Sequence, residues 1–210
     1  MDLPLTARGI LLGFSIAAVF GPIGLLCLRR TLAGGFAIGF VSGLGAATAD
    51  ATYAAIAGFG VSAIASLLVD QRIVLRLVGG AFLVYLGAQI VRSKPATQSA
   101  PAASIGLRVA GAYTSTLALT LSNPMTILSF GAIFAGLGLG SLAASSTAEA
   151  LELVLGVFGG SAAWWLVLAS LTARLRSRVT RARLRLVNVA SGLLILGFGI
   201  QSLASAWLAA

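Results

Sequence analysis

Several residue types that enzymes and metal proteins depend on are absent or scarce in this chain. Its 210 residues include no histidine, one cysteine, Cys27, and five acidic residues. A single cysteine excludes an intrachain disulfide and a Cys-x-x-Cys redox pair, and the lack of histidine excludes haem or zinc sites that need it. An enzyme would also need a nucleophile with a nearby base. We therefore expect no enzymatic activity, no cofactor and no metal site.

Apolar residues, by contrast, are abundant. They make up 59% of the chain and charged residues 9%, which is too apolar for a water-soluble fold of this size. Because about 20 apolar residues cross a bilayer as one helix, we predict an all-α polytopic membrane protein with six transmembrane helices in a single domain, residues 1–210. The second helix extends to about Ala63, and the fourth run is long enough to break within the membrane. The six runs are Gly9 to Leu28, Phe36 to Ala49, Leu77 to Val91, Val109 to Ala148, Leu153 to Ala173 and Leu186 to Ala210.

The net charge of +9 is unevenly distributed along the chain. With six spans, one side of the membrane receives eleven of the 14 basic residues and the other side three, Arg8, Arg72 and Arg76. Because cytoplasmic loops carry the excess of Lys and Arg, we predict that the basic side is cytoplasmic and that both termini lie outside. The charge thus indicates topology rather than nucleic-acid binding. An alternative further role of the basic loop from Arg174 to Arg185 is binding of anionic lipid.

The chain divides into two similar halves. A small, polar linker with two prolines, residues 94–104, joins halves of about residues 1–93 and 105–210. Each half holds three spans, so the second enters the membrane in the opposite sense, which predicts a 3+3 inverted repeat and alternating access of a central site. Both halves end on the pattern Gly, six residues, Gly, one residue, Gln. It consists of Gly80, Gly87 and Gln89 in the third span and Gly192, Gly199 and Gln201 in the sixth.

Prolines interrupt spans 1 and 4 at matching places, as Gly21-Pro22 and Asn123-Pro124. Proline kinks or breaks a helix, and broken helices at corresponding positions of two halves mark the binding site of a transporter. The free amides at the start of a half-helix suit a substrate carboxylate. We therefore predict substrate or proton binding at Gly21, Pro22, Gly24, Asn123 and Pro124. For either proline alone, a simple kink is an equally good explanation.

Asp50 is a carboxylate near the middle of the second span, where a charge costs about 2.5 to 3.5 kcal/mol. A stripe of small residues at three- or four-residue spacing indicates that Asp50 faces the bundle interior. In the functional interpretation it binds a cationic group of the substrate or takes up and releases a proton. In the structural one it is a protonated or Arg-paired carboxylate that ties helices together. We favour the first, because carboxylates within the membrane are functional by default. The stripe consists of Gly39, Gly43, Ala47, Ala54 and Gly58.

Four further residues are candidates for the pathway or for pairing with Asp50. Arg29 and Arg30 end the first span, where they either pair with Asp50 or only anchor the topology. Tyr53 and Trp164 are candidate pathway residues, although core packing is the commoner role for Trp164 and its neighbour Trp165. We expect no site role for Arg76, which can snorkel to the outer interface.

Five segments together resemble the LysE/RhtB family of amino-acid exporters, the LysE-type translocators. The resemblance spans nearly the whole chain and implies a bacterial inner-membrane exporter with six helices that moves an amino acid or related metabolite outward in exchange for protons. It places the family's first motif on Gly21-Pro22, its acidic position on Asp50 and its second motif on Asn123-Pro124. Many members read Pro-Gly-Pro at the first motif, where this chain has Phe20 before Gly21. The segments are FGPIGLLCLRRTL (20–32), GFVSGLGAATADATY (39–53), LRLVGGAFLVYLGAQIVRS (75–93), LSNPMTILSF (121–130) and NVASGLLILGFGIQSL (188–203).

Two other functions compete with amino-acid export. One is export of a metal cation. A single buried acid without histidine offers few ligands for such an ion, because a hard divalent ion takes about six oxygens. The other is a membrane scaffold whose small-residue faces mediate assembly. The partners we expect are a small-molecule substrate, protons and the lipid bilayer, with no nucleic acid. Glycines such as Gly156, Gly159 and Gly160 serve either internal packing or a homodimer.

Overall fold

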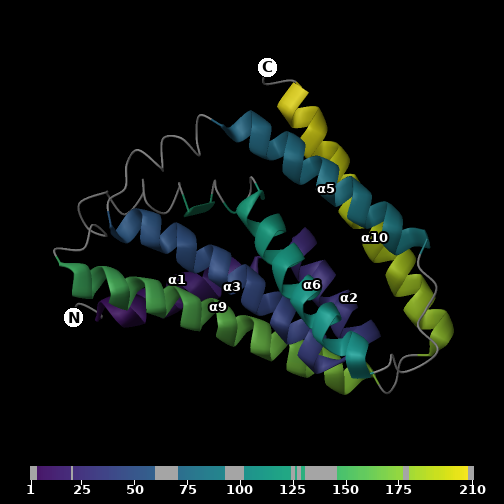
Figure 1. Cartoon of the computed structure of the whole chain (residues 1–210), viewed down its shortest axis with the longest axis horizontal. Helices are drawn as coiled ribbons and strands as arrows, with labels where there is room; N and C mark the ends of the chain where they lie inside the picture. The colour runs from purple at the N-terminus through teal and green to yellow at the C-terminus, as the bar shows by residue number, and fades with distance from the viewer. Residues whose placement is uncertain are drawn as a thin grey trace.

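The computed structural model describes residues 4–19, 21–59, 71–92, 102–123, 126, 129–130, 146–176 and 180–207. Those residues form an all-helical protein with seven α-helices and no strand (Figure 1). Each of the six apolar runs overlaps at least one of these helices. The helices are α1 (Leu5–Ala18), α2 (Pro22–Gly34), α3 (Phe36–Gly58), α5 (Arg72–Arg92), α6 (Ala102–Leu121), α9 (Thr147–Arg176) and α10 (Arg181–Trp207).

The first apolar run is a bent pair of helices. α1 ends at Ala18, and α2 begins at Pro22 with Gly21 as its N-cap. The two helix axes differ by 79°. Proline is well tolerated at the first position of a helix, where its missing N–H would have no helical partner. The break therefore falls at the Gly-Pro pair that the sequence singles out.

A single residue, Gly35, connects α2 to α3. Its φ is +93°, a conformation that glycine adopts without the steric penalty of a side chain. Its N–H donates to the carbonyl of Thr31 at 2.8 Å and so closes the last turn of α2. The chain thus reverses within one residue, which lays α2 and α3 against each other.

Glycines bring the helices of the bundle into backbone contact. α1 packs along α9, where a Cβ added at Gly13 or Gly160 would collide with the carbonyl of Val157 or Ile10. α5 packs along α10, where Gly80 lies against Gly199 and Gly87 against Gly192. Such close approach strengthens van der Waals packing between helices that gain little from hydrophobic burial in lipid.

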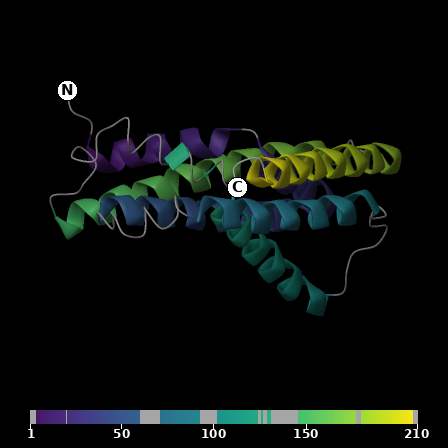
Figure 2. The ribbon, with the colours of Figure 1, turned by 90° about the horizontal axis from the view of Figure 1, so that it is seen from above.

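The helices form two groups that α2 connects. Figure 1 shows α5 and α10 side by side, apart from the group that contains α1, α3 and α9. α6 packs on α3, and its N-terminal end projects away from the other helices in Figure 2. α2 contacts α3 and α9 in one group and α10 in the other.

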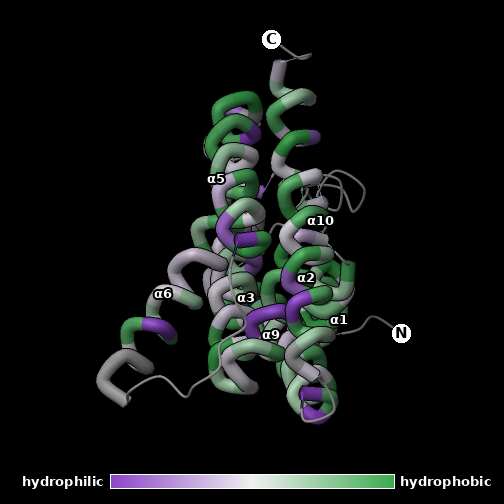
Figure 3. Tube along the Cα trace, turned by 90° about the vertical axis from the view of Figure 1, so that its right-hand side faces the viewer, coloured by the Kyte–Doolittle hydropathy of each residue, from purple (hydrophilic) through white to green (hydrophobic). Residues whose placement is uncertain are grey.

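Among the described residues, three helices can each cross a membrane by length and composition, and the bent pair α1 and α2 counts as a fourth if it forms one span. The three are Ile73–Arg92, Thr147–Arg176 and Leu184–Trp207. Figure 3 shows tubes that are largely hydrophobic, with short hydrophilic stretches in α2 and α6 among others. The predicted all-α membrane architecture is thus confirmed, while the number of six spans stays a prediction.

The described helix of the predicted fourth span, α6, begins within the predicted linker. α6 begins at Ala102, so the last three residues of the predicted linker, 102–104, are helical, as suits their two alanines. α6 ends at Leu121, two residues before Asn123, well within the predicted run from Val109 to Ala148. Pro124 and the segment 131–145 lie outside the described residues.

Gly159 and Gly160 give a matched test of the packing between α1 and α9. A Cβ at Gly160 would meet the backbone of Ile10, whereas one at Gly159 would meet no atom of the described residues within 4 Å. We expect Gly160→Ala to lower the free energy of unfolding by about 1–3 kcal/mol and Gly159→Ala to leave it unchanged or slightly raised. Thermal unfolding of the purified proteins in detergent measures both. Equal stability of the two variants would contradict the packing described here.

Candidate functional site

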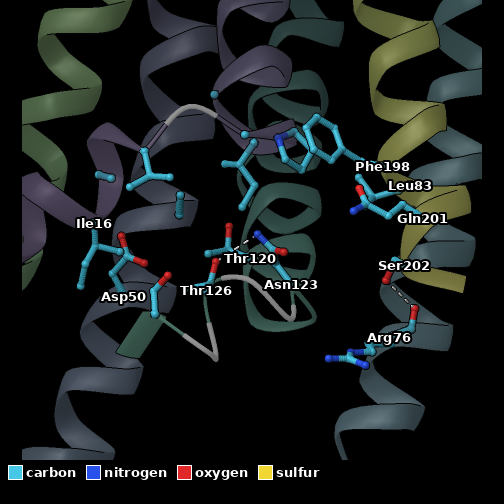
Figure 4. Close-up of a pocket in the computed structure, with 18 of the residues that line it drawn as sticks. Ile16, Asp50, Arg76, Leu83, Thr120, Asn123, Thr126, Phe198, Gln201 and Ser202 are labelled. Atoms are coloured by element: carbon cyan, nitrogen blue, oxygen red, sulfur yellow. Dashed lines mark hydrogen bonds between the residues drawn. The ribbon is translucent and has the colours of Figure 1, made fainter. Parts of the chain in front are cut away.

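A cavity of about 320 Å³, here called the central cavity, lies where the two helix groups meet (Figure 4). Residues of α1, α2, α3, α6 and α9 line it on one side and residues of α5 and α10 on the other. It brings together all the described residues that we predicted for substrate or proton binding. They are Gly21, Pro22, Gly24, Asp50 and Asn123.

Asp50 is 3% exposed and lines the central cavity from α3. Ser161 of α9 donates its hydroxyl to Oδ2 of Asp50 at 2.7 Å, and the indole N–H of Trp165 donates to the same hydroxyl at 3.2 Å. The other carboxylate oxygen, Oδ1, accepts no hydrogen bond from the residues that the structure describes. The chain Trp165–Ser161 therefore fixes one oxygen of Asp50 and leaves the other available to a ligand.

The start of α2 also lines the cavity, through Gly21, Pro22, Ile23 and Gly24. The first hydrogen bond of this helix runs from the N–H of Leu25 to the carbonyl of Gly21 at 3.1 Å, and the amides of Ile23 and Gly24 have no partner among the residues that the structure describes. Gly21 has no side chain with which to cap them, and the space around its Cα is open. This end of α2 is suited to a negatively charged group, which the free amides and the helix dipole both favour.

The end of α6 forms a third part of the cavity wall. Asn123 is 8% exposed, and its side-chain amide donates to the hydroxyl of Thr126 at 3.1 Å. Both residues line the cavity. The phenol of Tyr53 donates to the carbonyl of Leu121 at 2.7 Å and so satisfies a group that the end of the helix leaves without a helical partner. Tyr53 thus holds α6 in place from outside the cavity lining.

Arg76 of α5 lines the cavity on the wall formed by α5 and α10, together with Gln201, Ser202 and Ser205. The hydroxyl of Ser202 donates to the backbone carbonyl of Arg76 at 3.1 Å, and the guanidinium lies 3.4 Å from the carbonyl of Ser205. The cavity therefore has a basic and an acidic side chain on different walls (Figure 4). Our expectation that Arg76 has no part in a site does not fit this placement.

Arg29 and Arg30 are engaged elsewhere. Arg30 donates to the hydroxyl of Ser42 at 3.1 Å and to that of Thr116 at 2.7 Å. Ser42 lies eight residues from Asp50 on the same helix, which is about 12 Å at 1.5 Å per residue. Arg29 donates to the side chain of Asn188 at 3.1 Å. Both line a second cavity away from Asp50, so the pairing that the sequence suggested is not seen.

The two adjacent tryptophans have different surroundings. Trp165 is 4% exposed and lines the central cavity, with Gly43 of α3 beneath its ring. Trp164 points to α1, where its ring meets that of Phe14 edge-on with centroids 5.4 Å apart. Of the pair, Trp165 rather than the predicted Trp164 is the residue at the cavity.

A known protein family matches most of the chain that carries this bent Gly-Pro helix, buried carboxylate and cavity. Residues 14–206 match the family described as LysE type translocator. The chain belongs to this family. It is therefore a multi-pass membrane protein of a transporter family, and the resemblance seen in the sequence is confirmed.

Two curated relatives are similar to the chain. Chemotactic transduction protein ChpE of Pseudomonas aeruginosa is 30% identical over 190 residues, which cover 90% of this chain and 92% of that protein. The uncharacterized membrane protein YahN of Escherichia coli is 30% identical over 138 residues, 62% of this chain and 60% of that protein. No solved structure matches the chain.

Three residues of this site were not among the predicted site residues: Arg76 and Trp165, which line the cavity, and Ser161, which donates to Asp50. Ser161 lies four residues before Trp165, so the two share a helix face, and this spacing was the available signal. Arg76 stands one turn before Gly80 of the repeated glycine pattern, and that pattern marks the face of α5 that meets α10. In both cases the signal was a shared face, which shows a function only once the facing helix is known.

Proposed function

We propose that this protein is a secondary active exporter of an amino acid or a related zwitterionic metabolite, coupled to protons and working by alternating access. One observation carries the proposal. The central cavity combines a buried carboxylate, a free helix N-terminus and an arginine in a space of about 320 Å³.

The cavity has separate places for the two charges of a zwitterion. Oδ1 of Asp50 accepts a hydrogen bond from an ammonium group. The free amides at the start of α2 and the guanidinium of Arg76 bind a carboxylate. The apolar lining, including Leu83 and Phe198, leaves room for a small side chain. Both ends of such a substrate are thus bound without leaving a charge unpaired in the membrane.

Asp50 also gives a simple route to coupling. A carboxylate that binds either the substrate ammonium or a proton cannot hold both, so release of one accompanies uptake of the other. Exchange of an outgoing substrate for an incoming proton follows if the cavity opens to each side in turn. The hydrogen bond from Ser161 supports both states, because a hydroxyl donates to a carboxylate and also accepts from a carboxylic acid.

The helix packing supports the predicted 3+3 inverted repeat, with halves of about residues 1–93 and 105–210. Gly80 and Gly87 correspond to Gly192 and Gly199 in the repeated pattern, and the contacts run from Gly80 to Gly199 and from Gly87 to Gly192. If the two halves are exchanged, Gly80 takes the place of Gly192 and Gly87 that of Gly199, so the contact between Gly80 and Gly199 becomes the contact between Gly192 and Gly87. In the same way, α1 packs on α9 as α6 packs on α3. Such a pseudo-twofold arrangement is what alternating access by two similar packings requires.

For the orientation, we propose a multi-pass protein of the bacterial inner membrane with both termini outside. Arg29, Arg30, Arg108 and Arg176 gather around the second cavity at one end of the bundle. The positive-inside rule makes this end cytoplasmic. Arg76 and the end of α10 then lie toward the outside, and the central cavity extends from Asp50 in that direction.

The metal-cation and scaffold alternatives gain less support. Asp50 is the one acidic residue among the described residues that line the central cavity. A hard divalent ion takes about six oxygens, and a zwitterion needs only one carboxylate and one cation. A scaffold gives no reason for a carboxylate, an arginine and a free helix end to meet at one cavity.

Replacing Asp50 with Asn tests the proposal directly. We expect wild-type protein in liposomes, loaded with a mixed pool of amino acids under a pH gradient, to deplete one compound or a few, and Asp50→Asn to abolish this depletion. Mass spectrometry of the liposome contents measures both. Asn retains the size of the side chain and removes a buried charge, so the variant should elute as a folded protein in size-exclusion chromatography. Export by Asp50→Asn at the wild-type rate would contradict the proposal.

Replacing Arg76 with Gln separates carboxylate binding from coupling. We expect Arg76→Gln to raise the KM of the exported compound roughly tenfold, as loss of a charge-assisted hydrogen bond of about 1.4 kcal/mol does. Arg92→Gln, an exposed arginine at the other end of the same helix, is the matched control and should leave the KM unchanged. Concentration-dependent export from the same liposomes gives the values. An unchanged KM in Arg76→Gln would exclude Arg76 from substrate binding.

A further inference from the structure

A second cavity, of about 450 Å³, is lined by four arginines and is here called the arginine cavity. Arg29 and Arg30 come from α2, Arg108 from α6 and Arg176 from α9, while Asn188 of α10 completes the polar lining. Orientation of the chain by the positive-inside rule needs basic residues on one side of the membrane, but it does not need residues from three helices to converge on one space.

The arginine cavity has no acidic residue among its described lining. Glu149 and Glu152 belong to the first turns of α9, and Arg176 is the last residue of this helix, roughly 36 Å away at 1.5 Å per residue. Asp50 accepts its hydrogen bond from Ser161 at the central cavity. Four cationic groups thus face one space whose described walls supply no negative charge.

Hydrogen bonds to neutral groups hold two of these arginines, Arg30 and Arg176, in place. Arg30 donates to the hydroxyls of Ser42, Ser115 and Thr116. Arg176 donates to the carbonyl of Leu32 at 3.1 Å, near the end of α2. A guanidinium has five N–H donors in a rigid fork, so these bonds position the groups without neutralising them. The result is a preorganised site for an anion with several acceptor oxygens.

We infer that the arginine cavity binds a phosphate group, carried either by an anionic phospholipid or by a soluble phosphate compound. Phosphate oxygens match the guanidinium fork, and one phosphate can accept from several arginines at once. The cavity contrasts with the central one, which pairs an acid with a base. It is therefore a site for a ligand whose binding end is purely anionic, distinct from the zwitterionic substrate. The inference does not depend on which compound the protein exports.

Binding of three probes to the purified protein in detergent tests the inference: short-chain phosphatidylglycerol, phosphatidylcholine as the lipid of zero net charge, and inorganic phosphate. Native mass spectrometry counts bound lipid, and titration calorimetry measures phosphate. We expect Arg29→Gln/Arg108→Gln to weaken binding of the preferred phosphate probe roughly tenfold or more. Arg92→Gln/Arg185→Gln removes the same charge from exposed positions outside the cavity and should retain wild-type affinity.

Each result has a defined meaning. If Arg29→Gln/Arg108→Gln loses binding of phosphatidylglycerol only, the phosphate group belongs to a lipid headgroup. If it loses binding of inorganic phosphate only, the phosphate group belongs to a soluble compound. Arg108 is exposed, so Arg108→Gln alone retains the buried hydrogen bonds and should show the same preference more weakly if the double variant does not fold. Equal weakening in the cavity and control variants, or no binding of either phosphate probe to wild type, would overturn the inference.

Discussion

The hydrogen bond between Asp50 and Ser161 ties together the two central helices of this protein. It forms because Gly43 lets α3 approach α9 until the ring of Trp165 lies on its backbone. The same approach buries the carboxylate at 3% exposure beside the central cavity. A charged group at this depth needs polar partners. Ser161 supplies one, and the cavity leaves the second carboxylate oxygen to be matched by a ligand or a proton.

The two cavities differ in the charges of their described lining residues. At the central cavity, one acid and one base stand on different walls, a pattern that suits a zwitterion. At the basic end, four arginines face a cavity without a described acid, a pattern that suits a phosphate. α2 connects the two, because its N-terminus lines the first cavity and its last turns line the second. A shift of α2 would therefore move lining residues of both cavities.

Much of this arrangement could be predicted from the sequence. Apolar runs and the Gly-Pro pair predicted the membrane helices and the bend before Pro22, and the small-residue stripe predicted that Asp50 faces inward. Partners across helices could not be predicted, because they depend on which faces meet. The sequence suggested Arg29 and Arg30 as partners of Asp50, yet these arginines donate to Thr116 of α6 and Asn188 of α10. The sequence predicted that Arg76 snorkels to the outer interface and has no site role. Only the packing of α5 on α10 places it at the cavity.

Alternating access requires that the cavity at Asp50 opens to each side of the membrane in turn. Ala46 lines this cavity one turn before Asp50, and Cys27 is the only native cysteine, so Ala46→Cys in a Cys27→Ala background gives a single reporter. A membrane-impermeant maleimide added to intact cells should label this cysteine from the outer face of the membrane. Added to inverted vesicles, it should label the cysteine from the cytoplasmic face, and the exported compound should slow both reactions. Labelling from neither side, or labelling that the compound does not affect, would contradict the account.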